Sequence, residues 1–569
     1  MKNDARDAEL PGWWQSLLFM VKTNLLKFFR SVREIGDRPM MHVASGNGSD
    51  RAVVGEARVL LWSQSSSAEF SLTAGKVENL RVAAKPLHGL EIPAGEVFSF
   101  WRQLGRTTKR KGYRVGRELR EGCLIPNRGG GLCQLSGLLY QAALQAGLEI
   151  VERHGHSHII PGSLGEQNLD ATVFWNYVDL RFRAEFSWRL EVELTAMDLV
   201  VRIKGDEKEN APSLTQAVVR KPVTGDCLTC QETGCFRHPS ATSSHAPSQG
   251  HSAFLLDTRW PEFDRWCGGH SREGDRWFVP LDGQRFDKMN YAWSIPERAK
   301  VKRSTALTVW RSIQQRKLPS EGAVRQKKLL SADRRLAKSY AKKLSPECRH
   351  VVVSQNLLLY LWEMGVLGGR TFDVLIERWP MEELQRRLDQ AAVRHPESPT
   401  LQDFRADESF MKLENDALAR AARLVTPHRA LAEFFGERAW LLDWEMPESK
   451  PRVGAVGEHF FLPCSPLGRK GIYDLRSLSR KLLVLGKARE GIEVGKFEQG
   501  TMADLATAYA VVLPAWIEHQ PRLALKALSM GIPVFATADC GLPKHLCLQI
   551  PKRDEFCELA CIFPEPVSS

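Results

Sequence analysis

The sequence predicts a multidomain protein in which an α+β N-terminal domain is followed by α/β, Rossmann-like lobes. The chain has 569 residues, a length that suggests three or four domain-sized units. In the N-terminal half, a helix-periodic segment after Gly129 is followed by strand-like alternation over residues 186–205. In the C-terminal half, short β-branched strands alternate with helices, which is typical of parallel sheets with crossover helices.

The most informative segment is GGGLCQLSGLLYQAAL at residues 129–144, where three glycines lead to Cys133 at the start of an apolar helix. Free N–H groups and the helix dipole at such a position favour a thiolate. The downstream segment ERHGHSHII supplies His156, and LDATVFWNYVDLRF supplies Asp170. Cysteine, histidine and carboxylate are the residues that a thiol nucleophile needs with its base and orienting acid. A buried structural cysteine beside a glycine turn fits the same residues.

Four ordered blocks within residues 75–183 resemble the VanW family, named for an accessory protein of vancomycin-resistance clusters. The blocks are KVENLRVAAKPLHGLEIPAGEVFSFWRQLG, GGGLCQLSGLLY, VERHGHS and LDATVFWNYVDLRFR. The resemblance implies a VanW-like domain, which we place at residues 41–210. Some members look like cysteine-dependent L,D-transpeptidases of peptidoglycan, which implies Cys133 as nucleophile and His156 as its partner. The backbone N–H of Gln134 is then our candidate for an oxyanion donor.

Residues 1–40 contain the basic amphipathic segment GWWQSLLFMVKTNLLKFFRSVRE. Its uninterrupted apolar run ends at Lys22, far short of the roughly 20 residues that span a membrane. We also find no export signal, and therefore expect a cytoplasmic protein. Two alternatives stay open for the helix: it lies peripherally on the inner face of the membrane, or it packs on the protein itself.

The composition favours acidic partners and no nucleic acid. A net charge of +12 and an isoelectric point near 9.1 suit phosphates, nucleotide sugars or a membrane surface. We find no recognition-helix motif and no aromatic platform for single strands, so nucleic acid is not a predicted partner. The 12 cysteines are scattered over a long chain, and most are expected to be reduced thiols.

A polar segment at residues 211–250 contains a candidate metal knuckle in DCLTCQETGCFRH. Its possible ligands form a CxxC pair followed by a CxxH pair: Cys227, Cys230, Cys235 and His238. Thiolate and imidazole in this pattern suit tetrahedral zinc. The alternative is a set of reduced thiols without a metal.

Three segments of the C-terminal half, at residues 412–436, 467–479 and 514–541, resemble retaining glycosyltransferases of the GT-B fold. The resemblance implies a nucleotide-sugar donor, an N-terminal lobe at residues 251–445 and a donor lobe at residues 446–569. In that family a basic pair binds the donor diphosphate, and it corresponds here to Arg469 and Lys470. Glu518 corresponds to the first of two family glutamates, but Lys526 stands at the second place.

Together these observations predict a cell-envelope glycan enzyme that joins a VanW-like domain to a glycosyltransferase. The acceptor is expected to be a glycan or a peptidoglycan precursor. The alternative is a non-catalytic binding or scaffold protein of the envelope or antibiotic-resistance type, in which the glycosyltransferase module is degenerate. Lysine at position 526 favours that alternative, because its side chain has no acceptor to offer a donor hydroxyl.

Overall fold

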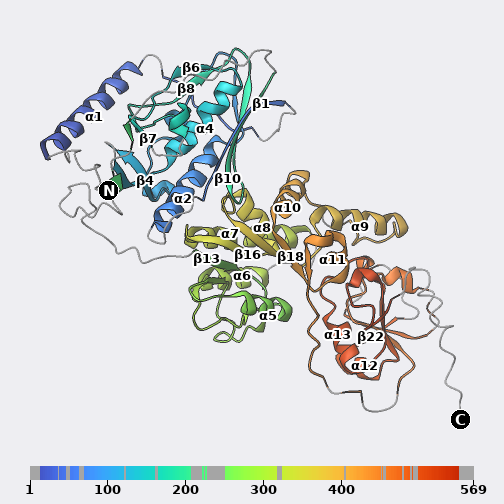
Figure 1. The fold of residues 1–569 in the computed structure, drawn as a ribbon. Coiled ribbons are helices and arrows are strands. Elements are labelled where there is room, and N and C mark those ends of the chain that lie inside the picture. Colours follow the sequence, from blue (N-terminus) through green and yellow to red (C-terminus); the bar gives the residue numbers. More distant parts are fainter. Residues whose placement is uncertain are drawn as a thin grey trace, which may run out of the picture. The chain divides into compact units, whose positions relative to one another are not determined.

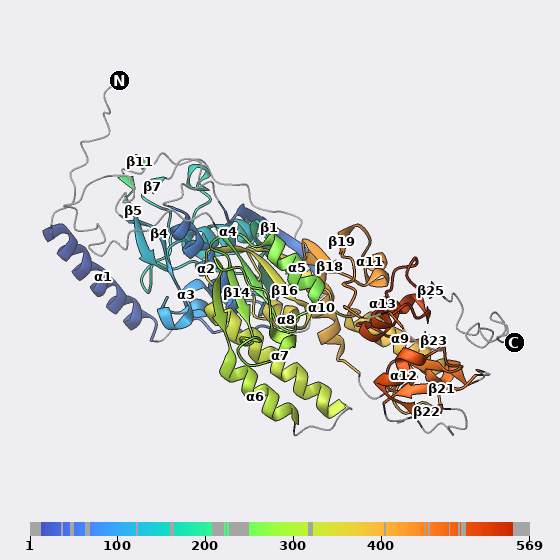
Figure 2. The same cartoon turned by 90° about the horizontal axis from the view of Figure 1, so that it is seen from below.

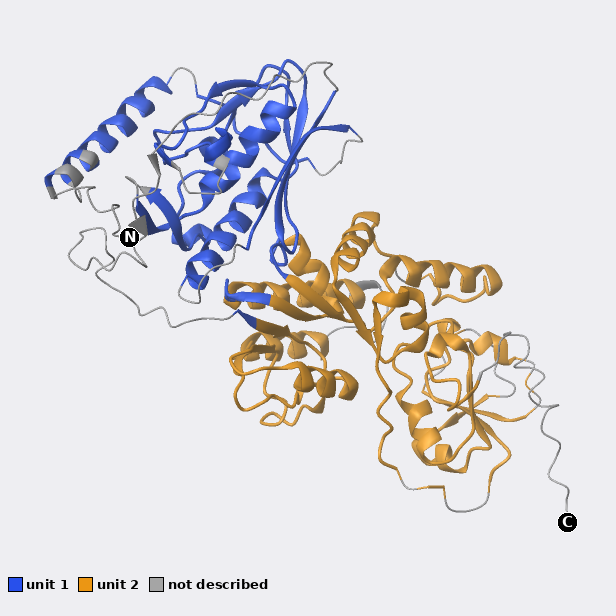
Figure 3. Cartoon of the chain, viewed as in Figure 1, with its two compact units in different colours: residues 1–251, 345–349, 365–370 blue, residues 252–344, 350–364, 371–569 orange. Residues whose placement is uncertain are grey.

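The computed structural model shows two compact units (Figure 3). Unit 1 comprises residues 1–251, 345–349 and 365–370, and unit 2 comprises residues 252–344, 350–364 and 371–569. The structure describes residues 13–35, 38–45, 51–62, 69–120, 123–159, 164–206, 221–222, 225–226, 250–316, 323–402, 405–449, 451–452, 456–476, 478, 480–486, 490 and 497–549. The boundaries at residues 40, 210 and 445 stay predictions.

Unit 1 is built on a four-stranded antiparallel sheet covered by two helices (Figure 1). The strand order is β1 (Ala52–Leu60), β10 (Asp198–Gly205), β9 (Trp188–Leu194) and β2 (Leu90–Ile92). Helices α2 (Phe70–Leu87) and α4 (Leu132–Gln145) pack on this sheet and on each other. Their apolar faces bury Leu80 and Leu138 with Trp188 in one core, which removes that surface from water.

Three smaller sheets complete unit 1. The hairpin of β4 (Val115–Arg120) and β5 (Cys123–Arg128) also pairs with β12 (Gly225–Asp226). Strands β3 (Phe98–Ser99), β8 (Arg181–Arg183) and β6 (Glu149–Glu152) form a second sheet, and β7 (His158–Ile159) pairs with β11 (Lys221–Pro222). Short helical turns are α3 (Phe100–Leu104), η1 (Lys109–Lys111) and η2 (Leu164–Gln167).

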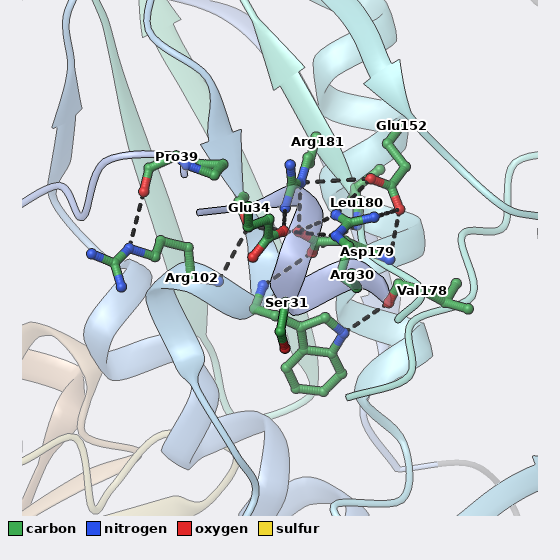
Figure 4. Close-up of polar contacts among 12 residues, drawn as sticks. Arg30, Ser31, Glu34, Pro39, Arg102, Glu152, Val178, Asp179, Leu180 and Arg181 are labelled. Carbon is green, nitrogen blue, oxygen red and sulfur yellow. Dashed lines mark hydrogen bonds and ion pairs between the residues drawn. The ribbon is translucent and has the colours of Figure 1, made fainter. Parts of the chain in front are cut away.

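Helix α1 (Trp13–Arg33) is attached to the rest of unit 1 by a network of ion pairs between side chains (Figure 4). Arg30 binds both carboxylate oxygens of Glu152, at 3.0 and 2.8 Å, and its Nε lies 2.6 Å from Glu34. Arg181 pairs with Glu34 and, at 2.9 Å, with the buried Asp179. Each charge in this network therefore has a partner of opposite sign, which offsets the cost of removing it from water.

The first lobe of unit 2 is a seven-stranded sheet in the order β15, β14, β13, β16, β17, β18, β19. These strands are β13 (His251–Leu255), β14 (Arg276–Val279), β15 (Lys300–Arg303), β16 (Cys348–Ser354), β17 (Thr371–Leu375), β18 (Arg423–Thr426) and β19 (Ala439–Leu441). Numbered along the chain, the order is 3-2-1-4-5-6-7, and its first six strands follow the Rossmann order 3-2-1-4-5-6.

The helices of this lobe are α5 (Pro261–His270), α6 (Thr305–Arg316), α7 (Ala323–Lys343), α8 (Gln355–Glu363), α9 (Met381–Arg394), α10 (Glu408–Arg420) and α11 (Arg429–Phe435). Helices α6 and α7 lie side by side (Figure 2). Shorter turns are η3 (Met289–Tyr291) and η4 (Gly436–Arg438).

The second lobe repeats the same strand order in a six-stranded parallel sheet: β22, β21, β20, β23, β24, β25. The strands are β20 (Phe460–Leu462), β21 (Leu482–Leu485), β22 (Phe497–Gly500), β23 (Ala510–Leu513), β24 (Val534–Ala536) and β25 (Leu548–Gln549). The helices are η5 (Gly468–Lys470), η6 (Ile472–Leu475), α12 (Met502–Thr507), α13 (Arg522–Ser529) and η7 (Ala538–Cys540).

The structure confirms the predicted fold class. Strands β20 and β23 are buried along their whole length, as expected for central strands of a parallel sheet with both faces covered. Unit 1 is α+β, and unit 2 contains two Rossmann-like lobes. Among the helices that the structure describes, none is both long and apolar enough to cross a membrane.

We expect Asp179→Asn to destabilise unit 1 by roughly 3 kcal/mol, because breaking a buried charge network leaves its remaining members uncompensated. The Asp179 carboxylate accepts hydrogen bonds from Ser99 Oγ at 2.6 Å, Trp101 N at 3.1 Å and Arg181 Nε at 2.9 Å. Urea unfolding followed by tryptophan fluorescence measures the change. The exposed Asp206→Asn is the matched control, and equal stability losses in the two variants would contradict this account.

Candidate functional site

The glycine turn between β5 and α4 positions Cys133. Gly129 and Gly131 have φ angles of +83° and +97°, which side chains with a Cβ rarely adopt. A Cβ on Gly130 would lie 2.4 Å from the carbonyl carbon of Gly116, so the turn packs directly on β4. Helix α4 then begins at Leu132, and the half-buried Cys133 lies in its first turn.

His156 lies between Cys133 and Asp170 and hydrogen-bonds with both side chains. Its Nδ1 is 2.6 Å from Asp170 Oδ2, and its backbone N–H donates to the same oxygen at 2.7 Å. Burial by itself would lower the pKa of His156, but the hydrogen bonds with Asp170 and Cys133 outweigh it and raise the pKa to about 9. At neutral pH the imidazole is therefore a cation with the thiol on one side and the carboxylate on the other.

The loop that contains Asp170 is held from two sides. Arg153 donates to Asp170 Oδ1 at 3.1 Å and to Asn168 O at 2.9 Å. On the other side, the buried Ser136 of α4 donates to Ala171 O at 2.6 Å. Because α4 also contains Cys133, the bond from Ser136 fixes the carboxylate loop relative to the thiol.

The other two histidines of the His156 segment, and Gln134, have other partners. His154 is about half exposed and lies 3.4 Å from Glu152 Oε1, and Nδ1 of His158 contacts Ser157 Oγ at 3.0 Å. The Gln134 backbone N–H donates to Gly131 O at 3.0 Å, and its side chain donates to Leu60 O at 3.1 Å. An oxyanion would therefore have to replace Gly131 O as acceptor for the Gln134 N–H.

The candidate zinc ligands Cys227, Cys230, Cys235 and His238 lie outside the described residues. Within the described ranges, no group of three or more histidine, cysteine, aspartate or glutamate side chains is placed to hold a metal ion.

In the second lobe, Lys470 and Glu518 lie on either side of the point where the strand order reverses. Lys470 follows β20 and Glu518 follows β23, and these two strands are parallel neighbours. Ligands of open α/β sheets bind at such a switch point, outside the carboxyl ends of the strands. Lys470 Nζ is 2.6 Å from Glu518 Oε2 and also donates to Ile517 O at 3.2 Å.

Glu518 is a buried carboxylate kept in its ionised form by its neighbours. Burial would raise its pKa, but the charge of Lys470 and the hydrogen bonds from Lys470 and Gln520 outweigh burial and lower the pKa. The Gln520 backbone N–H donates to Glu518 Oε1 at 2.9 Å. Both carboxylate oxygens are thus held in place beyond the carboxyl end of β23.

Arg469 and Lys526 do not join this ion pair. The Arg469 side chain is exposed, and its backbone oxygen accepts hydrogen bonds from Trp516 N at 3.0 Å and Ile517 N at 3.2 Å. These bonds tie the loop after β20 to the loop after β23. Lys526 lies in α13, and none of the side-chain hydrogen bonds found among the described residues uses its amine.

His428, which sequence reasoning missed, connects the two lobes of unit 2. It follows β18, and its Nδ1 accepts a hydrogen bond from Leu431 N, so the ring proton is on Nε2 and donates to Glu518 O at 2.8 Å. Burial lowers the pKa of His428 and keeps the ring neutral. Its position directly after a strand of the parallel sheet is the signal that identifies it in the sequence.

The switch point of the first lobe also carries a buried polar cluster that the sequence reasoning missed. Asp257 follows β13 and accepts from Arg311 at 3.1 Å and from Asn356 at 2.6 Å. Glu377 follows β17, and burial, reinforced by the charge of Asp257, raises its pKa to about 8. Glu377 Oε1 accepts no hydrogen bond from the described residues, so it has a free position for a donor.

Comparison with known proteins gives two separate similarities. Residues 75–204 match the family model described as VanW like protein. The vancomycin B-type resistance protein VanW of Enterococcus faecalis is 32% identical over 161 residues, which are 27% of this chain and 58% of that protein. The uncharacterized protein YoaR of Bacillus subtilis is 33% identical over 117 residues, 21% of this chain and 38% of that protein. The chain thus spans less than two thirds of both relatives.

The chain is also similar to solved structures of other proteins. Sucrose-phosphate synthase from Thermosynechococcus elongatus has a TM-score of 0.34 at 13% identity, over 55% of this chain and 89% of its own. HepE from Anabaena, solved with UDP and glucose, has a TM-score of 0.32 at 13% identity, over 55% and 90%. The repeated strand order, rather than these scores, defines the fold of unit 2. A VanW-like domain therefore occupies residues 75–204, and two Rossmann-like lobes follow it.

Proposed function

We propose that this protein is a cell-envelope glycan enzyme in which a VanW-like thiol domain is joined to a nucleotide-sugar-dependent glycosyltransferase. The observation that carries the proposal is the Lys470–Glu518 pair at the switch point of the second lobe. A half-buried cation beside a buried carboxylate offers one partner for a phosphate and one for sugar hydroxyls.

In this proposal the donor diphosphate displaces Glu518 from Lys470. The ammonium of Lys470 and the exposed guanidinium of Arg469 offset the negative charge that develops as the nucleotide leaves. Glu518, still held by Gln520 N, then accepts hydrogen bonds from donor hydroxyls. The acceptor, a glycan or a peptidoglycan precursor, presents a hydroxyl to the free oxygen of Glu377 in the first lobe.

In the same proposal, the thiol domain catalyses acyl transfer of the transpeptidase type. The Cys133 thiol gives its proton to His156, and the resulting thiolate attacks an acyl carbon. A C–S bond forms as the carbonyl π electrons move to the oxygen, which becomes an oxyanion next to the N–H groups of the first turn of α4, including that of Gln134. The His156 imidazolium gives its proton to the departing amine when the carbon–nitrogen bond breaks. Asp170 keeps the imidazole in place and balances its charge.

A binding or scaffold function is the second candidate, and Lys526 favours it. The lysine stands where the glycosyltransferase resemblance calls for a second glutamate, and an ammonium cannot accept a hydrogen bond from a ribose hydroxyl. A protein of this kind would bind its ligands without catalysing a reaction.

Lys470→Ala tests the glycosyltransferase proposal. Removing a charge-assisted bond of roughly 1.5–3 kcal/mol is expected to weaken nucleotide-sugar binding by about tenfold to a hundredfold. Calorimetric titration with UDP-sugars and GDP-sugars measures this change. The control is Lys481→Ala in the same lobe, where an exposed lysine pairs with Glu498 at 2.6 Å.

Binding unaffected by Lys470→Ala would remove the donor site from this position. A wild-type protein that binds none of these nucleotide sugars would support the scaffold function instead.

The pH dependence of stability tests the His156 site. Since the folded pKa of about 9 lies above the ordinary value of 6.5, the stabilisation is fully present below pH 6.5 and is lost as the pH rises through about 9. We expect the Tm of unit 1 to fall more steeply across this window in the wild type than in His156→Gln. The exposed His154→Gln should keep the wild-type slope, and parallel curves for all three proteins would refute the site.

Metal analysis tests the zinc knuckle proposed at Cys227, Cys230, Cys235 and His238. We expect about one zinc per chain in protein purified without chelator, and loss of that zinc in Cys227→Ser/Cys230→Ser. Cys267→Ser, which changes a buried cysteine of unit 2, should keep the metal. Purified wild type with less than about half an equivalent of zinc would rule the knuckle out.

A further inference from the structure

Helix α1 contacts unit 1 through a polar stripe rather than an apolar one. Among its described side chains and the turn that follows, Thr23 is buried, and Lys27, Arg30 and Glu34 are half-buried, as is the apolar Leu17. The four polar positions are spaced by four, three and four residues, which places them on one side of the helix. Arg30 and Glu34 make the ion pairs with Glu152 and Arg181 that attach the helix (Figure 4).

The opposite side of α1 is apolar and exposed. Seven large side chains retain between 48% and 68% of their surface: Trp14, Leu18, Val21, Leu25, Phe28, Phe29 and Val32. At about 100° of rotation per residue, they occupy an arc of roughly 100° centred opposite the polar stripe. A surface helix ordinarily turns such a stripe toward its own core, so α1 has the reverse orientation.

A continuous exposed apolar face of this kind marks an interaction surface. The ion pairs of Arg30 already hold α1 on unit 1 (Figure 4), so the apolar residues are not needed for attachment. They are also not free to turn inward without breaking those ion pairs. The face is therefore available to a partner while the helix stays in place.

The charges on α1 identify the chemistry of the partner. The helix has four basic residues and no acidic one. Arg30 is used by the network, whereas Lys22 and Arg33 are exposed along one edge of the apolar face. A second copy of the helix would bring the same positive charge, so self-association through this face is opposed. An anionic surface with an apolar interior complements both features.

We propose that α1 lies in the plane of an anionic lipid bilayer, with its apolar face among the acyl chains and Lys22 and Arg33 at the headgroups. The helix is 21 residues long, or about 30 Å, and it lies along the surface without crossing it. Arg30 stays bound to Glu152 in this state, so the bilayer binds unit 1 together with the helix. The proposal is independent of the glycosyltransferase reaction.

Vesicle co-sedimentation of the full chain tests the proposal. The wild type should bind phosphatidylcholine vesicles that contain phosphatidylglycerol and bind pure phosphatidylcholine more weakly. Leu25→Gln/Phe28→Gln removes apolar surface from the face and should weaken binding by on the order of tenfold or more. Lys22→Gln/Arg33→Gln should remove most of the preference for phosphatidylglycerol.

Matched controls separate the face from the rest of the helix. Met20→Gln changes an apolar residue that is 53% exposed but lies off the face, and should bind vesicles as the wild type does. Light scattering of each protein reports its oligomeric state, and urea unfolding reports its fold. Equal binding by the wild type and Leu25→Gln/Phe28→Gln would overturn the proposal. So would a wild-type oligomer that this double variant dissociates, because the face would then be a protein interface.

Discussion

The constraint on which this structure depends is that a buried carboxylate stays ionised only with a paired cation or a set of hydrogen-bond donors, because an isolated buried charge is too costly to retain. Asp179 forms an ion pair with Arg181 where α1 is attached, and Glu518 forms one with Lys470 in the second lobe. Asp170 forms ion pairs with Arg153 and His156 next to Cys133. Asp179 also accepts a hydrogen bond from Ser99, 80 residues away, and Glu518 is 48 residues from Lys470. The interactions that satisfy these two charges therefore also join separate segments of the chain.

Strand order decides where the two lobes of unit 2 gather polar residues. In both sheets the strand order reverses between the first and the fourth strand along the chain, and the loops that leave the carboxyl ends of those two strands border one crevice. Asp257 and Asn356 lie at this point in the first lobe, and Lys470 and Glu518 lie there in the second. His428 connects the lobes by donating to the Glu518 backbone. Charged residues in these loops are therefore neighbours although long stretches of chain separate them.

Much of the fold was predictable because periodicity is a local property of the chain. The C-terminal half alternates short parallel strands with helices, and a helix begins at Leu132 after the glycines, both as the pattern indicates. The partners of Cys133 were harder to predict from the sequence, because the segment ERHGHSHII contains three histidines, each two residues from the next. Selection of His156 depends on the Asp170 loop and on Ser136, which positions that loop. Glu377 and His428 carried no motif at all, only a place after a strand.

The sequence by itself determined the order of the domains, the parallel character of the C-terminal sheets and the amphipathic pattern of the first helix, because each follows from the spacing of neighbouring residues. Tertiary structure alone decided the orientation of that helix. Arg30, which looks in the sequence like one more surface cation, is committed to Glu152 and Glu34. That pairing turns the polar stripe toward the protein and the apolar side chains away from it. No local pattern contains this information, since Glu152 is 122 residues away along the chain.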